Sequence, residues 1–283
     1  MMLRLDPQFP LVWRSPFGMQ VGIDPVVVRI DDVTDAQQRM LAALAVGTSS
    51  PGLAVMAGGR GPEAAAARDE LLELVAPALE SVRPPELGTV AISGSGTLTS
   101  AIAALLANHG VAVLVAADAA DLAESQPDLA VIVGHFVLAP HLHALWLRRD
   151  IPHLSVVVGD TATVVGPMIE PGNGPCLLCL ELHHRDADRA WPAIASQLLG
   201  RVSGAETAIL VAETAAAAAR MVVDRLQRPA GGGTAESLRI DGTTGERRRR
   251  QWQVHPECGC RGIRGLEEIT NDRSSQFRQE PAW

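Results

Sequence analysis

The chain has 283 residues, of which 47% are hydrophobic and 20% are charged, and its formal net charge is −8. This composition supports one large or two modest globular domains with a hydrophobic core, and it excludes a chain that is disordered throughout. The 24 basic residues are all arginine, since the sequence contains no lysine. A Walker A lysine, a Schiff-base lysine and any lysine contact with a nucleotide phosphate are therefore excluded.

Charge and hydropathy argue against a nucleic-acid or membrane role. The only basic run is Arg247–Arg250, for which we predict a solvated strand or hairpin face. The most apolar stretch, at 129–147, contains glycine, proline and histidine, and a buried strand that leads into a helix explains it better than a membrane span. The N-terminus lacks a cationic region followed by an apolar stretch, so we expect no secretion signal and a cytoplasmic protein.

Residues 1–85 form the first predicted domain. Three strand-like runs separated by proline- and glycine-containing turns precede two helical patterns, and a short third helix fits between the helices. This order predicts a winged-helix-like α+β module that ends at a proline-rich break at 83–86, because consecutive prolines cannot continue a helix. The predicted strands are 11–14, 18–23 and 26–30, and the main helices begin at Asp35 and span 63–82.

Residues 86–260 form the second predicted domain, in which apolar strands alternate with helices. Such a pattern is typical of a parallel sheet covered on both faces, so we predict a Rossmann-like, doubly wound α/β fold. After a linker at 229–233 comes a predicted hairpin, and the polar tail at 261–283 is expected to be poorly ordered. The predicted strands are 89–93, 111–116, 129–133, 154–158, 163–169, 237–241 and 248–254, and the predicted helices are 99–108, 141–149, 186–199 and 205–226.

A glycine-rich turn lies between the first strand and the first helix of this domain. Gly94 and Gly96 occupy the first two glycine positions of a nucleotide-binding fingerprint, and Asp118 follows the next strand, where it fits a ribose contact or a turn cap. Thr99 replaces the third glycine, and we expect its side chain to push the helix and strand apart. Two interpretations stay open, a strand–turn–helix without a ligand and a nucleotide site. The strand at 129–136 ends without a carboxylate for Mg²⁺, which argues against ATP–Mg²⁺ binding.

Two closely spaced cysteine pairs carry the strongest chemical signal. Cys176 and Cys179 form one pair, and Cys258 and Cys260 form the other. Four thiolates in two such pairs predict a closed tetrahedral zinc site, which would staple the C-terminal hairpin onto the α/β domain. A redox pair and two disulfides are the alternatives. If all four bind zinc, none is left as a covalent thiol carrier.

The eight histidines suggest no catalytic arrangement. His183 and His184 follow the first cysteine pair, where they could orient zinc ligands. His255 could also orient a zinc ligand, or it could be an exposed loop residue. Gly-x-Ser-x-Gly, His-Glu-x-x-His and paired-carboxylate motifs are absent from the sequence.

Four features together resemble the E1-like ThiF/MoeB/HesA superfamily: the glycine turn, the acidic residue after the next strand, Gly174-Pro175 directly before the first cysteine pair, and the second cysteine pair far downstream. The segments 174–183, 188–192 and 255–260 resemble one branch more closely, the E1-like partners of YcaO cyclodehydratases in thiazole/oxazole-modified peptide biosynthesis. The resemblance covers residues 87–260, and it implies a homodimer. In that branch the N-terminal module recognises the leader segment of a precursor peptide, which agrees with the α+β module predicted for 1–85.

The resemblance implies that a peptide strand pairs with the edge of the run at 26–30. Active superfamily members adenylate a carboxylate with an arginine, a lysine and an acidic Mg²⁺ ligand, but the segment 119–128 has neither basic residue. We therefore expect a degenerate E1-like protein that presents a leader peptide to a YcaO-type cyclodehydratase for azoline formation, with no catalytic residue of its own. The candidate peptide contacts are Val26, Val27, Val28, Leu71, Leu72 and Val75, which fit the module's own core equally well.

Two other functions stay open. One is an active adenylyltransferase in which Arg148 or Arg149 replaces the lysine. The other is a nicotinamide-dependent oxidoreductase, which only the glycine turn and Asp118 suggest.

Overall fold

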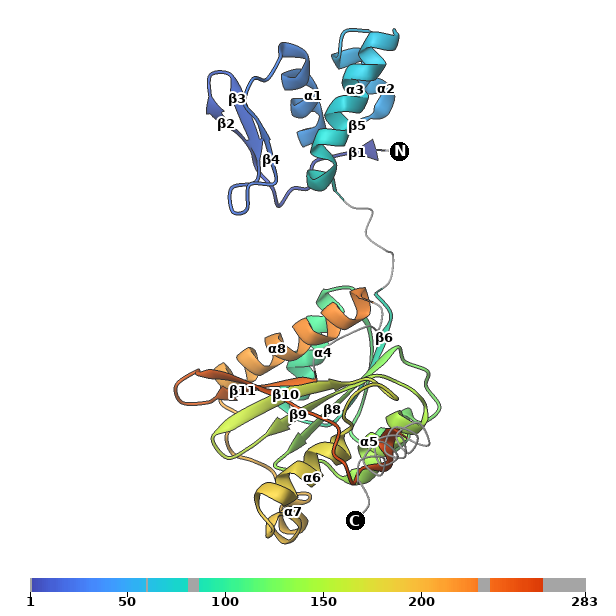
Figure 1. Cartoon of the computed structure of the whole chain (residues 1–283), viewed down its shortest axis with the longest axis vertical. Helices are drawn as coiled ribbons and strands as arrows, with labels where there is room; N and C mark the ends of the chain where they lie inside the picture. The colour runs from blue at the N-terminus through green and yellow to red at the C-terminus, as the bar shows by residue number, and fades with distance from the viewer. Residues whose placement is uncertain (1, 60, 81–86, 229–234, 262–283) are drawn as a thin grey trace, which may run out of the picture. The chain divides into compact units, whose positions relative to one another are not determined.

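The computed structural model describes residues 2–59, 61–80, 87–228 and 235–261 (Figure 1). The chain divides into two compact units, one within Met1–Pro84 and one within Pro85–Trp283. The predicted proline break at 83–86, the linker at 229–233 and all of the predicted tail except residue 261 lie outside the described residues. Within the described part of the chain, no helix is long and apolar enough to cross a membrane.

The first unit contains a three-stranded antiparallel sheet, three helices and a short strand pair that the sequence analysis did not predict (Figure 1). Its core is formed by apolar side chains from the strands and the helices together. In chain order the elements are β1 (Met2–Leu3), β2 (Leu11–Ser15), β3 (Gly18–Val21), β4 (Val28–Ile30), α1 (Asp35–Val46), β5 (Thr48–Ser49), α2 (Ser50–Met56), α3 (Pro62–Val75) and the 3₁₀ turn η1 (Ala76–Ala78).

Local chemistry explains where the helices of this unit begin and end. Thr34 caps α1 through a capping box with Gln37, and Pro62 begins α3, where its missing N–H costs nothing. The predicted helix at 63–82 was too long, because α3 ends at Val75. Pro77 cannot donate the N–H bond that would continue the helix, and the chain tightens into η1 instead.

The second unit is built on a seven-stranded sheet with helices on both faces. Most predicted elements are present, with boundaries that differ by a few residues. In chain order the elements are β6 (Thr89–Ser93), α4 (Thr97–Asn108), β7 (Ala112–Ala116), η2 (Ala119–Leu122), β8 (Leu129–His135), α5 (Pro140–Arg148), β9 (His153–Val158), β10 (Ala162–Ile169), α6 (Leu177–Ala187), α7 (Trp191–Leu198), α8 (Ala208–Gln227), β11 (Glu236–Asp241), β12 (Arg247–Gln251) and η3 (Gly259–Arg261).

The strand order in this sheet is β12-β11-β10-β9-β8-β6-β7. The four strands from β9 to β7 are parallel, and β10, β11 and β12 continue the sheet in antiparallel fashion. Helices α4 and α8 cover one face, and α5 and α6 cover the other (Figure 1). The structure is thus a mixed α/β unit, and the expectation of a parallel sheet holds for its first four strands.

The segment around the first cysteine pair differs from the prediction. A single helix was expected at 186–199, but the structure has α6 and α7, which are separated at Asp188–Ala190. Pro192 lies in the first turn of α7, where its ring is tolerated, whereas it would remove a backbone bond from a continuous helix. Helix α6, which carries Cys179, was not predicted, since the expected helix began only at Asp186.

The buried imidazole of His153 is expected to make folding sensitive to acid. Its side chain is fully buried at the start of β9, and burial lowers its pKa to about 4. Because the folded state binds the proton less well, stability is complete above about pH 6.5 and falls by roughly 3 kcal/mol as the pH drops from 6.5 to 4. Urea unfolding across this range should be less pH-dependent in His153→Leu than in the parent. His141→Leu, at an exposed histidine, should behave like the parent, and an unchanged slope in His153→Leu would contradict the assignment.

Candidate functional site

The four cysteines lie together in the second unit. Their Sγ atoms are all within 4.8 Å of one another. The separations are 3.9 Å for Cys176 and Cys179, 3.6 Å for Cys176 and Cys258, and 3.6 Å for Cys179 and Cys260. These distances are too long for a disulfide, whose sulfurs lie about 2.05 Å apart.

The spacing of the sulfurs fits a tetrahedral zinc ion. A Zn–S bond of about 2.3 Å places the sulfurs of a regular tetrahedron about 3.8 Å apart, which lies within the range of the three separations. Four thiolates are also the donor set of closed structural zinc sites. The residues present therefore fit zinc, which would supply structural coordination and leave no open position for a substrate.

Local structure brings the two cysteine pairs together. Cys176 is the N-cap of α6 and Cys179 lies in its first turn, while Cys260 lies in η3 near the end of the described chain. Arg185 on α6 lies 2.8 Å from a carboxylate oxygen of Glu257, which precedes the second pair. A metal at this position would join α6 to the C-terminal segment across 78 intervening residues, between Cys179 and Cys258.

Three of the four thiols resist ionisation when no cation is present. Burial raises the pKa of Cys258 to about 12 and that of Cys176 and Cys260 to about 11. Burial also acts to raise the pKa of Cys179, but hydrogen bonds from the backbone at His255 and Cys176 outweigh it and lower the pKa overall. A divalent cation would offset the cost of placing four thiolates together, so metal binding would release protons.

The histidines near the four cysteines hold the surrounding segments together and do not belong to the group of candidate metal ligands. His255 is buried, with 2% of its surface exposed, so of the two roles weighed for it the exposed loop residue was wrong. Its Nε2 lies 2.9 Å from Oδ2 of Asp186 on α6, and its Nδ1 accepts the backbone N–H of Glu257. His183 Nε2 lies 3.0 Å from the carbonyl oxygen of Gln253. Both histidines thus tie α6 to the segment that carries the second cysteine pair.

The glycine turn is shaped by close packing. Gly94 has a φ of +144°, and a Cβ there would lie 2.9 Å from the carbonyl oxygen of Val133 on β8. Thr99 was expected to push the helix and strand apart, but its hydroxyl instead donates to the carbonyl of Ser95, in space that a side chain at Gly94 would restrict. Gly96 is the N-cap of α4 with a φ of +94° and has open space around it.

Two carboxylates lie near the carboxyl ends of the parallel strands, one from Asp118 and one from Glu206. Asp118 caps η2, where its Oδ1 accepts the N–H of Ala120 at 2.9 Å, as a turn cap does. The sequence indicated no carboxylate at the end of β8, yet Glu206, from the segment before α8, lies 3.5 Å from Nε2 of His135. The sequence separation of these two residues hides this contact, which depends on the packing of α8.

The candidate peptide contacts fall into two groups. Val28, Leu71 and Val75 are buried in the core of the first unit, with at most 4% exposure, so their side chains support the module from within. Val26 is 44% exposed just before β4, whereas Val27 and Leu72 are partly buried. Strand β4 is an edge strand of the three-stranded sheet. Its outer backbone edge pairs with no other strand among the described residues.

No protein-family model matches the sequence. No curated protein matches it either. Solved structures do share the fold. A heterocyclase solved in complex with substrate and cofactor matches 92% of this chain and 39% of its own, with a TM-score of 0.69 and 15% identity.

Two further structures match the chain over both of its units. The heterocyclase TruD matches 93% of this chain and 43% of its own, with a TM-score of 0.65 and 20% identity. MccB of E. coli, solved with ATP, matches 93% of this chain and 100% of its own, with a TM-score of 0.55 and 14% identity. The chain spans about two fifths of the heterocyclase chains. It therefore has the fold of MccB and of the matched part of these heterocyclases.

Proposed function

We propose that the chain is a degenerate E1-like protein that binds the leader segment of a ribosomal precursor peptide and presents it to a YcaO-type cyclodehydratase for azoline formation. The observation that carries the proposal is the correspondence of both units, in one chain, with the matched part of two heterocyclases. In this proposal the first unit is the winged-helix-like recognition module and the second is the Rossmann-like E1 domain.

Peptide capture is assigned to the edge of β4. An exposed strand edge offers unpaired backbone groups, to which an extended peptide adds as a further strand. Val28 and Ile30 are buried, so the core fixes the strand and presents its backbone edge. Val26 adds an exposed apolar contact next to this edge. We assign Leu71, Leu72 and Val75 on α3 to supporting the core behind this edge, with Leu72 alone among them partly exposed.

The second unit is assigned a scaffold role. The chain has no lysine for a nucleotide phosphate, and Asp118 is engaged as a turn cap. Zinc at the four cysteines would hold the fold and take no part in catalysis. Ring formation is assigned to the partner cyclodehydratase, which in this proposal corresponds to the remaining three fifths of the heterocyclase chains. The proposal includes a homodimer, for which exposed Leu114 and Val115 on the edge strand β7 offer apolar surface.

The test is binding of a fluorescein-labelled precursor leader from the same genome, measured by anisotropy with the full zinc-loaded chain. Val26→Asp places a charge beside the edge of β4 and should weaken binding about tenfold or more, because an apolar contact is lost and a carboxylate is desolvated. Val46→Asp, at a valine that is 82% exposed at the end of α1, is the matched control and should bind like the parent. Equal binding by the two variants would refute the assignment of the edge.

An active adenylyltransferase is the second candidate. Two observations favour it. MccB has been solved with ATP. Glu206 provides a carboxylate at the end of β8, which pairs with β6, the strand that leads into the glycine turn. Calorimetric titration with ATP–Mg²⁺, run beside peptide-dependent pyrophosphate exchange, separates the two functions. The scaffold proposal predicts neither signal, whereas saturable ATP binding with exchange would replace it.

A further inference from the structure

A cavity of about 560 Å³ lies in the second unit, on the face of the sheet that α5 and α6 cover. Its floor is a cross-strand row on β9, β10, β11 and β12, since Val157 pairs with Val164, Val164 with Arg239, and Arg239 with Arg248. The floor thus changes from apolar at the middle of the sheet to cationic at its edge. This volume lies in the range of small-molecule sites.

One wall of the cavity is aromatic. His184 on α6 lies between two tryptophans, with ring centroids 5.1 Å from Trp191 and 5.4 Å from Trp252. The guanidinium of Arg250 stacks over the ring of Trp252 at 3.9 Å. All four side chains line the cavity. This wall offers ring edges and faces to a flat apolar molecule.

Two buried nitrogen atoms on the lining lack a partner. Nδ1 of His143 and Nδ1 of His184 are both inaccessible and have no hydrogen-bond partner among the described residues. Burial lowers the pKa of both histidines, so both rings are neutral near pH 7. Buried polar atoms are rarely left unsatisfied, but neither nitrogen is open to the cavity, so a ligand could reach either one only if the imidazole ring turned.

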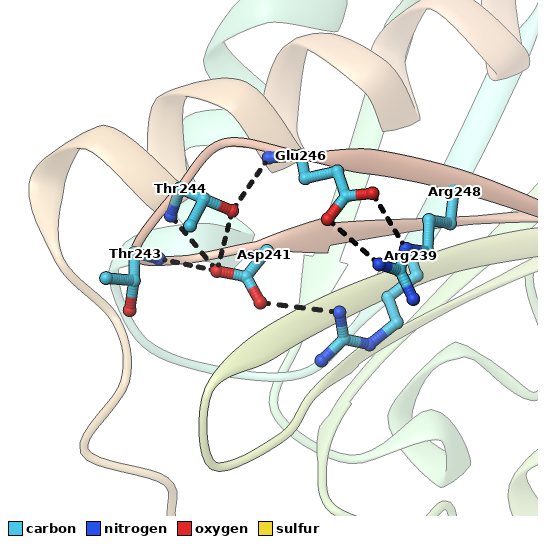
Figure 2. A network of polar contacts seen from close by, with 6 residues as sticks. All are labelled: Arg239, Asp241, Thr243, Thr244, Glu246 and Arg248. Atoms are coloured by element: carbon cyan, nitrogen blue, oxygen red, sulfur yellow. Dashed lines mark hydrogen bonds and ion pairs between the residues drawn. The ribbon is translucent and has the colours of Figure 1, made fainter.

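The arginines of the lining differ in how they are neutralised. Arg239 lies 3.4 Å from Asp241 and Arg248 lies 2.9 Å from Glu246, and both pairs belong to the β11–β12 turn (Figure 2). Arg249 lies 2.5 Å from Glu236. Arg250 has no carboxylate partner in the described part of the chain, while the one acidic group of the lining, Glu181, accepts the indole N–H of Trp191 at 2.7 Å. Arg250 is therefore the cation of the lining that can receive an anion.

We propose that this cavity binds an aromatic carboxylate, with its ring system between the valine floor and the aromatic wall and its carboxylate on Arg250. A neutral ring would leave the cation unpaired, and a bare anion would leave the apolar floor and wall uncovered. The inference goes beyond the proposed function and does not depend on it, because the lining residues all belong to the second unit, whereas the proposed peptide contacts lie in the first.

The probe is 2-naphthoate, titrated into the full zinc-loaded chain by calorimetry, with tryptophan fluorescence as a second readout because Trp191 and Trp252 line the cavity. We expect saturable binding of one molecule per chain. Neutral 2-naphthamide and inorganic phosphate should each bind about tenfold more weakly or worse, since each lacks one half of the recognition. Equal binding of the amide, or tighter binding of phosphate, would overturn the proposal, as would the absence of naphthoate binding.

Three variants locate the site. Arg250→Gln should weaken naphthoate binding about tenfold and leave the weaker amide binding unchanged. Arg247→Gln, on the same strand but outside the lining, is the matched control and should bind like the parent. Val164→Phe should fill the floor and abolish binding, while the urea midpoint confirms that the variant is folded. Naphthoate binding that survives both Arg250→Gln and Val164→Phe would place the ligand elsewhere and contradict the assignment.

Discussion

Replacing Cys179 by serine is expected to remove the metal and to destabilise the second unit more than any exposed substitution. Cys179 is fully buried, and the cluster joins α6 to the C-terminal segment. Zinc binding energy contributes directly to folding, so we expect unfolding free energy to fall by about 3 kcal/mol or more. Elemental analysis should find one zinc per parent chain and almost none in the variant, and chelation of the parent should reproduce the loss of stability.

The matched control for this variant is Leu178→Ser, at the neighbouring position of α6. Leu178 is 45% exposed, so its replacement removes little buried surface and no ligand. It should retain zinc and unfold close to the parent, within about 1 kcal/mol. If Cys179→Ser kept its zinc, or if the parent bound none when purified without chelator, the zinc assignment would be wrong.

The second large effect is expected at the glycine turn. Gly94→Ala places a Cβ 2.9 Å from both the Cβ and the carbonyl oxygen of Val133, in a backbone conformation that alanine rarely adopts. Strain and overpacking together should lower the unfolding free energy by about 3 kcal/mol or more. Gly96→Ala meets open space and carries only the strain of a positive φ, about 1–2 kcal/mol. Urea unfolding of the two variants measures the difference.

This pair of variants also shows what the glycine pattern requires. A larger loss at Gly94 would mean that packing of β6 against β8 needs this glycine whether or not a nucleotide binds. Equal losses of unfolding free energy would mean that β8 moves to relieve the close contact with Val133, which would contradict the tight packing described for the glycine turn.

Much of the fold could be predicted from local patterns. The strands at 89–93 and 129–133 could be predicted because each is a continuous apolar run, and the metal site because the cysteines have the spacing of zinc ligands. Both signals lie within short segments of the sequence. The helix break before Pro192 and the end of α3 before Pro77 were missed because amphipathic periodicity continues across both prolines. Local backbone chemistry decided those boundaries.

The features that escaped prediction depend on contacts between distant segments. The contact between His255 and Asp186 joins residues that are separated in the sequence by α8 and the β11–β12 hairpin. Glu206 contacts His135 only when α8 packs on the sheet. The cavity was likewise not predicted, because Arg248 and Arg250 belong to a run that was expected to face solvent. The strand register places Arg248 opposite Arg239, which itself lies opposite Val164. Leu71 and Val75 are buried in the core of the first unit, which was one of the two equal expectations for them; their role in peptide binding stays a prediction.

The central claim is tested most directly by reconstituting ring formation. A precursor peptide and a YcaO-type cyclodehydratase from the same genome are incubated with ATP, with or without this chain, and loss of water from the peptide is followed by mass spectrometry. We predict efficient dehydration only when the chain is present, with a reduced rate for Val26→Asp and a parental rate for Val46→Asp. Equal dehydration without the chain, or an equal rate with both variants, would contradict its role in presenting the peptide.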